Sequence, residues 1–219
     1  MNQAMLVDGS LPHVPTMASF VAIDTVLRAF ASGISQLRID VVLPEDEMER
    51  ELASLHARWS AQWSHLDIPD GLRLPGQPLS FRIREADGEH FIYAIDMEHN
   101  RLAAYIVMSR LIELDRRADR FLRSPHTKVA AAYRRMGIAS TVYRWWLDSG
   151  RSLMSGARQS PAAYALWQSL ARVHSSVYVS VAGKRVRALP SPVSAQARDD
   201  LETRLVLLGK GCGFRTFVS

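Results

Sequence analysis

The chain has 219 residues, of which 47% are hydrophobic and 22% are charged, a composition typical of a soluble globular protein with a core of its own. No apolar run approaches the roughly 20 residues of a membrane-spanning helix, and we expect neither a membrane segment nor a secretory signal. A single cysteine, Cys212, excludes an intrachain disulfide framework and fits a reducing compartment, so we expect a cytoplasmic protein.

The formal net charge of +5 permits an anionic ligand or partner but does not require one. Six arginines lie close together in the sequence, with acidic residues among them: Arg116, Arg117, Arg120, Arg123, Arg134 and Arg135. Two interpretations of this cluster stay open. It forms either a solvated helical face or a basic rim around a phosphate-bearing cofactor or a nucleic acid.

The N-terminal part of the chain predicts mainly helices. Apolar residues recur at helical spacing from Thr16 to about Ser35, and the run Leu37–Leu43 is typical of a short strand. Pro44 is followed by three acidic residues and predicts the start of a helix that runs to about Ser64, because proline suits the first turn and acids suit the positive end of the helix dipole. A Pro- and Gly-rich connection from Ile68 to Pro78 is a candidate boundary.

The middle of the chain predicts strands. Three segments have the alternation of strands: Leu79–Arg84, His90–Met97 and Arg101–Met108. Asp87-Gly88 and His99-Asn100 stand between them, where hairpin turns are expected. Ile112–Arg123 is charged and predicts a short helix or an ordered loop, and Thr127–Ala132 predicts a further strand.

The remaining segments alternate between helix and strand. They are a helix from Ile138 to about Ser149, a strand at Ser152–Ser155, a helix that begins at Ser160-Pro161, a hairpin over Ser176–Leu189, a helix from about Ala195 to Leu208 and a strand-like tail at Phe214–Val218. Gly150 is a typical residue just beyond a helix C-terminus. The order of all these elements predicts a mixed α/β sheet with helices on both faces.

The segment Val129–Ala139 carries the most specific functional signal in the chain. An apolar, strand-like run meets Arg-x-x-Gly-x-Ala at Arg134–Ala139, and an amphipathic helix follows. The first N–H groups of a helix lack intrahelical partners, and the helix dipole places partial positive charge there, so this helix start suits a pyrophosphate. The glycine at position 137 has no Cβ that would block the approach of such a group.

This segment resembles the acetyl-CoA-binding segment of the GCN5-related N-acetyltransferase (GNAT) family, with Ala131 where proline is frequent. The resemblance implies a mostly antiparallel mixed sheet flanked by helices, and acetyl-CoA or another acyl-CoA as cofactor. It also implies that the strand near Val129–Ala131 pairs with the pantetheine amides and that backbone N–H groups hold the pyrophosphate. The positions assigned to cofactor binding are Val129, Ala131, Arg134, Arg135, Met136, Gly137, Ile138, Ala139 and Ser140.

A second segment adds to the resemblance. Ser155–Ser160, followed by Ala163, Leu166 and Trp167, is similar to a pattern of bacterial and phage members of the family. In better-studied members a tyrosine at the position of Trp167 protonates the leaving thiolate. We therefore consider Tyr164, one helical turn earlier, and Ser155 as proton donors.

The resemblance implies direct attack of an amine on the thioester, with a backbone N–H near Val129 polarising the carbonyl. The residues preferred as general base, because they enter the cofactor strand, are Glu113, Asp115 and His126. Each of them is also compatible with a solvated charge or a strand-end histidine.

The resemblance covers about residues 80–190 and is strongest over 127–170. We expect an N-terminal helical extension over residues 1–75, which either packs on the core or folds separately, and an acyl-CoA-binding core over 76–219. The histidines and Cys212 show no metal-ligand spacing, so we expect no metal site.

These observations predict an acyl-CoA-dependent N-acyltransferase, with an amine acceptor that is a small molecule, a protein or a nucleobase. Three alternatives stay open. One is a GNAT-fold protein that binds the cofactor without turnover, and another is a GNAT-fold protein associated with nucleic acid through the arginine cluster. The third is an effector that grips another protein through residues 1–75.

Overall fold

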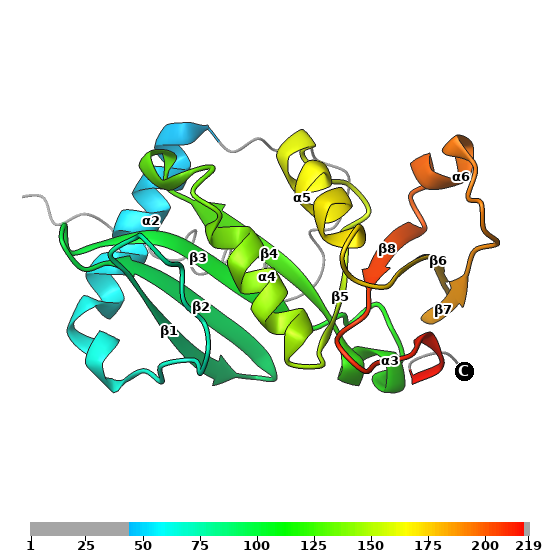
Figure 1. Cartoon of the computed structure of the whole chain (residues 1–219), viewed down its shortest axis with the longest axis horizontal. Coiled ribbons are helices and arrows are strands. Elements are labelled where there is room, and N and C mark those ends of the chain that lie inside the picture. Colours follow the sequence, from blue (N-terminus) through cyan, green and yellow to red (C-terminus); the bar gives the residue numbers. More distant parts are fainter. Residues whose placement is uncertain (1–43, 217–219) are drawn as a thin grey trace, which may run out of the picture. The chain divides into compact units, whose positions relative to one another are not determined.

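The computed structural model describes residues 44–216, which belong to one compact unit of the chain (Figure 1). The helix predicted at Thr16–Ser35 and the strand predicted at Leu37–Leu43 lie outside the described residues. The described strands are β1 (Leu79–Ala86), β2 (Glu89–Asp96), β3 (Arg101–Ser109), β4 (Leu122–Val129), β5 (Ser152–Met154), β6 (Ser176–Ala182), β7 (Arg185–Ala188) and β8 (Thr203–Leu207). The α-helices are α2 (Glu45–Trp59), α3 (Arg116–Phe121), α4 (Ile138–Asp148), α5 (Pro161–Ala171) and α6 (Ala195–Asp199), and the 3-10 helices are η1 (Ser60–His65), η2 (Ala131–Tyr133) and η3 (Phe214–Thr216).

The strands form one eight-stranded sheet in the order β1-β2-β3-β4-β5-β8-β6-β7. Every neighbouring pair is antiparallel except β4 and β5, which are parallel. The mixed, mostly antiparallel α/β fold expected from the sequence is therefore confirmed. The three predicted strands that precede residue 109 are also confirmed, and β4 begins five residues earlier than predicted and ends at Val129.

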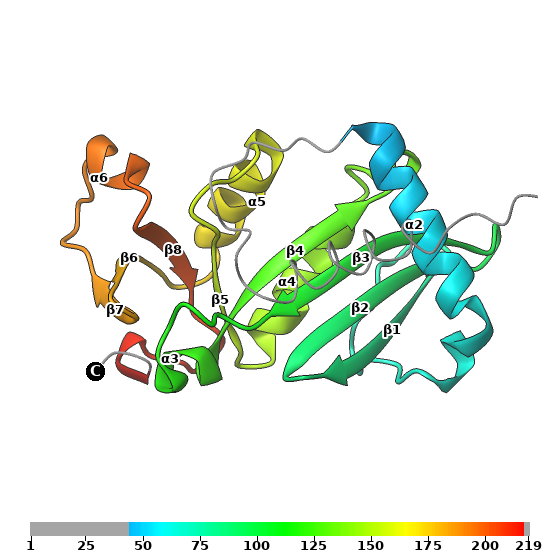
Figure 2. The same cartoon turned by 180° about the vertical axis from the view of Figure 1, so that it is seen from behind.

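Helices cover both faces of the sheet. On one face, the ring of Trp63 lies 5.0 Å from that of Tyr93 on β2, and Leu52 of α2 is 2% exposed. On the other face, the ring of Trp146 on α4 packs edge-on against that of His90 on β2, with 4.9 Å between the ring centroids. α5 lies beside α4 on this face, where Trp167 packs against Tyr143. Figure 1 shows α4 and α5 in front of the sheet, and Figure 2 shows α2 crossing its back.

The start of α2 agrees with its sequence. Pro44 precedes the helix, and Glu45, Asp46 and Glu47 occupy its first turn, where carboxylates interact favourably with the helix dipole. The hairpin turns also follow the sequence, because Asp87 and Gly88 both adopt positive φ angles, of 55° and 74°, as a two-residue turn between twisted strands requires.

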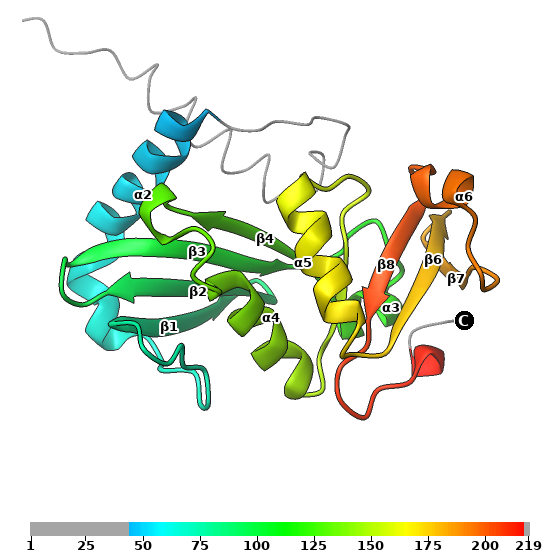
Figure 3. The same cartoon turned by 45° about the horizontal axis from the view of Figure 1, so that its top comes forward.

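The structure corrects the predictions for the C-terminal segments. The helix expected from Ala195 to Leu208 ends at Asp199, and residues 203–207 form β8, which lies between β5 and β6 in the sheet; Figure 3 shows β8 beside β6. All five residues of β8 are buried, so their pattern lacks the period of two that marks a half-buried strand. The tail expected as a strand forms η3 over Phe214–Thr216.

Candidate active site

The parallel strands β4 and β5 pair over only two positions, Leu122 with Ser152 and Arg123 with Leu153. From Ser124 to Val129, β4 stays paired with β3 but has no strand partner on its β5 side among the described residues. Figure 2 shows the two strands diverging from the point where they pair. The sheet therefore presents a free strand edge in its interior, a position where sheets normally leave none.

The direction of the free backbone groups follows from a hydrogen bond at the end of β4. The Ala130 N–H donates to the Ala103 carbonyl of β3 at 3.0 Å. Because alternate residues of a strand point their N–H and C=O groups to opposite sides, Lys128 also faces β3, whereas Thr127 and Val129 face the β5 side. The Arg134 Nε lies 3.4 Å from the Val129 carbonyl oxygen, which agrees with this direction.

The loop that follows β4 contains two residues in the left-handed region. Arg135 and Gly137 adopt positive φ angles of 62° and 87°, and Gly137 is the residue that precedes α4. Residues of positive φ redirect the N–H groups that follow them, and the first N–H groups of α4 have no intrahelical partner. A Cβ on Gly137 would meet Ser140 Oγ at 3.6 Å and Leu74 Cδ1 at 3.9 Å, so its φ angle, not crowding within the chain, makes glycine the favoured residue there.

The remaining residues predicted to bind a cofactor lie on this loop or beside it. Ile138 is 2% exposed, so it offers its backbone N–H while its side chain packs in the core. Arg135 and Met136 are exposed, and the Ser140 hydroxyl donates to the Gly137 carbonyl at 2.8 Å. The geometry thus brings together the loop residues that the sequence pattern selects.

Two of the predicted positions already have partners from α2. The Ala131 N–H donates to Glu49 Oε1 at 2.7 Å, and Arg134 lies 3.5 Å from a carboxylate oxygen of Glu45. Glu51 of α2 forms an ion pair with Lys128 on β4. Sequence reasoning missed this set of acidic side chains, although the i, i+4 spacing of Glu45 and Glu49 places both on one helix face.

A buried hydrogen bond anchors the start of the loop. The Tyr133 hydroxyl donates to Asp96 Oδ2 at 2.6 Å, and Asp96 also accepts from the backbone N–H groups of Glu98 and His99. The Tyr133 hydrogen bond is the main reason why the pKa of Asp96 lies well below its usual range. Burial, together with the Asp96 carboxylate, raises the pKa of Tyr133 to about 12. The loop is thereby tied to the β2–β3 turn.

The two candidate proton donors differ in their surroundings. The Ser155 hydroxyl donates to the Gly156 carbonyl at 3.1 Å and accepts from the Leu205 N–H at 3.0 Å, so it already links β5 to β8. Tyr164 on α5 is 51% exposed, and its hydroxyl has no hydrogen-bond partner within residues 44–216. Trp167 is 4% exposed and packs edge-on against Tyr143, 6.1 Å between ring centroids.

The three candidate bases lie in different places. His126 is on the unpaired stretch of β4, and Asp115 caps α3 by accepting from the Ala118 N–H at 2.8 Å. Glu113 lies in the loop before α3, and its Oε1 is buried without a hydrogen-bond partner in the described part of the chain. His126 is exposed overall, yet neighbouring atoms desolvate its ring and, with Lys128, lower its pKa below the ordinary value of 6.5.

The structure separates the arginine cluster into two groups. Arg116, Arg117 and Arg120 lie on α3 before β4, whereas Arg134 and Arg135 follow it. Eight residues of strand span roughly 25 Å. Arg123 turns inward, 15% exposed, and donates to the Asp119 carbonyl oxygen.

Residues 44–216 contain no group of three or more histidine, cysteine, aspartate or glutamate side chains that could hold a metal ion. None of the helices within these residues has both the length and the apolar character to cross a bilayer.

No protein-family model and no curated protein matches the sequence. Three solved structures are similar to it. A protein assigned as a phosphinothricin N-acetyltransferase is 16% identical with a TM-score of 0.34, and the match covers 73% of this chain and 92% of that one. An assigned acetyltransferase from Acinetobacter baylyi is 14% identical with a TM-score of 0.35, covering 90% and 89% of the two chains.

The third structure is a GCN5-related N-acetyltransferase from Kribbella flavida, 16% identical with a TM-score of 0.31, covering 88% of this chain and 92% of that one. All three are described as acetyltransferases.

Proposed function

We propose that this chain is an acyl-CoA-dependent N-acyltransferase, most simply one that transfers an acetyl group from acetyl-CoA to an amine. The observation that supports this most is the divergence of β4 from β5. It leaves the N–H groups of Thr127 and Val129 without a strand partner on an edge that leads directly into the loop and helix start at Gly137. An extended chain with amides and a pyrophosphate at one end matches both features.

The residues fit such a cofactor. The Val129 N–H would donate to a pantetheine amide as a neighbouring strand would, and the N–H groups from Arg135 to Ser140 would hold the pyrophosphate. The Ala131 N–H is bonded to Glu49, which moves the pantetheine contacts toward Thr127 compared with the sequence prediction. When bound, acetyl-CoA supplies the activated acyl group as a thioester.

The protein residues have separate roles in the transfer. The Thr127 N–H, which lies farther from the pyrophosphate loop than Val129, donates to the thioester carbonyl oxygen and stabilises the charge that develops there. His126, on the same unpaired stretch, accepts the proton of the attacking amine, and its lowered pKa keeps it unprotonated at neutral pH. Tyr164 donates a proton to the leaving sulfur, since the Ser155 hydroxyl is committed to β8.

The acceptor is an amine on a small molecule, a protein or a nucleobase, and a longer acyl chain replaces acetyl without changing these contacts. A second candidate is a protein that binds the cofactor without turnover. The buried Trp167 and the engaged Ser155 favour it, because both positions lack a free proton donor.

Calorimetric titration of the full chain with acetyl-CoA and with CoA tests the cofactor site, using Gly137→Asp and Gly137→Asn as a matched pair. Both side chains can cap a helix and both tolerate a positive φ, so both variants should fold. They differ by one negative charge. At about 5 Å and an effective dielectric constant near 20, that charge costs about 3 kcal/mol against an anion.

We expect saturable binding to the wild type, a small loss in Gly137→Asn and an at least tenfold further loss in Gly137→Asp. Equal affinities for the two variants would place the pyrophosphate elsewhere. Lack of binding to the folded wild type at millimolar ligand would refute the proposal. Saturable binding without acyl transfer to a panel of amines would select the second candidate.

A further inference from the structure

Charge is distributed unevenly along the described chain. Residues 44–109, which form α2 and the strands β1 to β3, contain 12 aspartates and glutamates and 6 lysines and arginines. Residues 110–216, which form the other strands and α3 to α6, contain 19 lysines and arginines and only 7 acidic residues. The second part thus carries a large excess of positive charge, and such an excess attracts an anionic partner to that part of the molecule.

Three elements bring part of this excess together on one side of the sheet. They pack around a hydrophobic cluster that includes Ala118 of α3 and Val186 of β7, and Phe214 of η3 packs against it. The Asp115 N–H at the start of α3 donates to the Lys184 carbonyl at 2.9 Å, so the turn between β6 and β7 lies beside α3. Figures 1 and 2 show η3, in red, next to α3 as well.

These elements carry five exposed basic residues, which we call the basic surface: Arg116, Arg117, Arg120, Lys184 and Arg215. None of the five forms an ion pair or a hydrogen bond through its side chain within residues 44–216. Arg185 and Arg187 do not belong to this surface. They alternate along β7 with Val186, which points into the hydrophobic cluster, so they face the other side of the sheet.

The carboxylates nearest to α3 already have partners in the fold. Asp115 accepts from the Ala118 N–H at 2.8 Å, and Asp119 is 6% exposed and pairs with Arg110. Three further acids lie around Arg204, where they oppose the lowering of its pKa by burial: Glu113, Glu202 and Asp200. The basic surface therefore keeps its charge available for a partner.

An exposed aromatic ring lies among these cations. Phe121, the last residue of α3, is 39% exposed, and the Arg120 guanidinium lies 5.7 Å from its ring centroid. Arg117 is one helical turn before Phe121 and is its neighbour on the helix surface. Every unpaired base has a face that stacks on an aromatic ring, while guanidinium groups bind phosphates. An acidic peptide would use the cations but has no need of the ring, so the combination favours a nucleic acid whose bases are unpaired.

We propose that the basic surface and Phe121 bind single-stranded nucleic acid. The phosphates of the strand contact the five cations, and one of its bases stacks on Phe121. Because these contacts reach phosphates and a base face rather than base edges, the binding tolerates different sequences.

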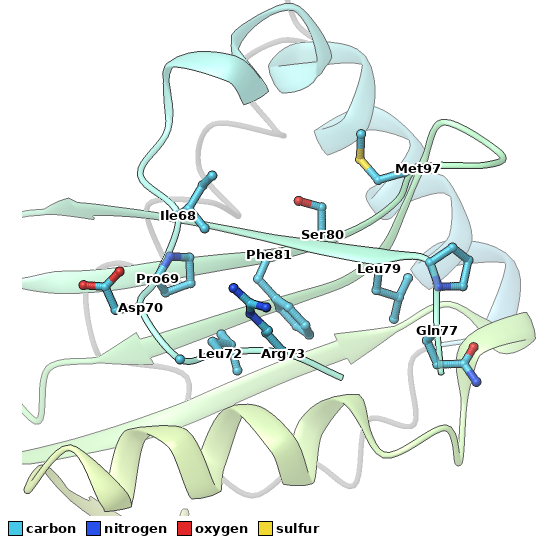
Figure 4. Close-up of a pocket in the computed structure, with 12 residues that line it drawn as sticks. Ile68, Pro69, Asp70, Leu72, Arg73, Gln77, Leu79, Ser80, Phe81 and Met97 are labelled. Carbon is cyan, nitrogen blue, oxygen red and sulfur yellow. The ribbon is translucent and has the colours of Figure 1, made fainter. Parts of the chain in front are cut away.

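The basic surface is separate from the other hollow and from the proposed active site. A pocket of about 400 Å³ lies beside β1 in the acidic part of the chain (Figure 4), and its charged lining residues, Asp70 and Arg73, leave it without excess charge. The proposed cofactor loop follows β4, whereas α3 precedes that strand. The inference therefore does not depend on acyl transfer, and it is tested without any CoA compound.

The probe is a fluorescently labelled oligothymidine of about 20 nucleotides, titrated with the full chain and followed by anisotropy at several salt concentrations. We expect saturable binding with a Kd of about 1–100 µM at physiological salt. Each phosphate that is neutralised on a single strand contributes about 0.7 to the fall of log K with log salt, so five contacts predict a slope of about −3.5. A duplex of the same length and a labelled polyglutamate serve as comparison ligands.

Protein variants test the individual contacts. Arg117→Gln and Arg120→Gln should each weaken binding and make the slope shallower by about 0.7. Arg187→Gln is the matched control, because it removes the same charge from an exposed arginine on the other side of the sheet, and it should leave the slope unchanged. Phe121→Leu removes the ring but no charge, so it should weaken oligothymidine binding at least fivefold with an unchanged slope, and should leave duplex binding unchanged.

Three results would overturn the proposal. The first is the absence of saturable oligothymidine binding at about 100 µM chain and low salt. The second is an equal change of slope in Arg117→Gln and Arg187→Gln, because the cations would then act only through the net charge. The third is polyglutamate binding that is as tight as oligothymidine binding, together with no effect of Phe121→Leu, because the partner would then be an acidic protein.

Discussion

Replacing Tyr133 by phenylalanine removes one hydroxyl from the buried contact that anchors the loop between β4 and α4. The Tyr133 hydroxyl donates to Asp96 Oδ2 at 2.6 Å, and the Asp96 side chain is 4% exposed. A hydrogen bond to a charged group contributes about 1.5–3 kcal/mol. Asp96 keeps the N–H groups of Glu98 and His99 and its contact with the His99 ring, and phenylalanine fills the same space. We therefore expect a loss near the lower end, about 1.5–2 kcal/mol.

The loss should depend on pH with a definite sign. The pKa of Asp96 in the folded chain lies below the ordinary value of 3.8, and Tyr133 is the largest contributor to that shift. A carboxyl group with a depressed folded pKa stabilises the protein fully above its unfolded pKa and loses this contribution as the pH falls. Both unfolded chains titrate alike, so the difference between wild type and Tyr133→Phe should be complete at pH 5–7 and shrink only as the pH falls below the folded pKa of Asp96 in the variant.

Urea unfolding of both proteins at several pH values from 3 to 7 measures this difference. Tyr178→Phe is the matched control, because the Tyr178 hydroxyl accepts from Gln168 Nε2 at 3.3 Å, a contact between neutral groups. We expect the control to lose at most about 1 kcal/mol, with no change across this pH range. A Tyr133→Phe loss that is below about 0.5 kcal/mol at pH 7, or that grows as the pH falls, would refute the assignment of Asp96 as a charged acceptor of this hydrogen bond.

Three further predictions concern catalysis. In the wild type, kcat/KM should decrease on the acid side with a midpoint below pH 6.5, because the pKa of His126 is lowered. His126→Gln should remove this acid limb of the pH profile, and an unchanged limb would exclude His126 as the base. Lys128→Met removes a nearby positive charge, so the pKa of His126 should rise and the limb should move to higher pH, whereas a shift to lower pH would contradict the role of Lys128. Tyr164→Phe should lower kcat roughly 10²-fold and leave the calorimetric affinity for acetyl-CoA unchanged. An unchanged kcat would show that water, and not Tyr164, protonates the leaving sulfur.

The core elements of this protein were predictable because their signals are local. Acidic residues after Pro44 start α2, Gly150 follows α4, and Asp87-Gly88 turns the first hairpin. The last helix prediction failed for a physical reason. Leu205 and its neighbours in β8 are buried on both faces, and a short apolar run of this kind carries no period that separates a strand from a helix.

The candidate site was predictable only in part. Arg-x-x-Gly-x-Ala marks the loop, and the positive φ of Gly137 gives a local reason for its glycine. The partners of that loop were not visible, because Glu49 and Asp96 are 82 and 37 residues away in the chain from the groups they bind. Nothing in the sequence distinguished Ser155 from Tyr164 as a proton donor. The Ser155 hydroxyl is engaged because it accepts from the Leu205 N–H of β8, a contact between distant segments.

The sequence by itself determined most of the elements before residue 195 and the loop that precedes α4, since helix starts, turns and left-handed positions depend on neighbouring residues. The tertiary structure alone decided that β4 parts from β5 after two residue pairs and that the turn between β6 and β7 lies beside α3. Both features arise from contacts between distant segments. Pairing depends on how the sheet is assembled around its core, and it is not determined by residues that are adjacent in the sequence.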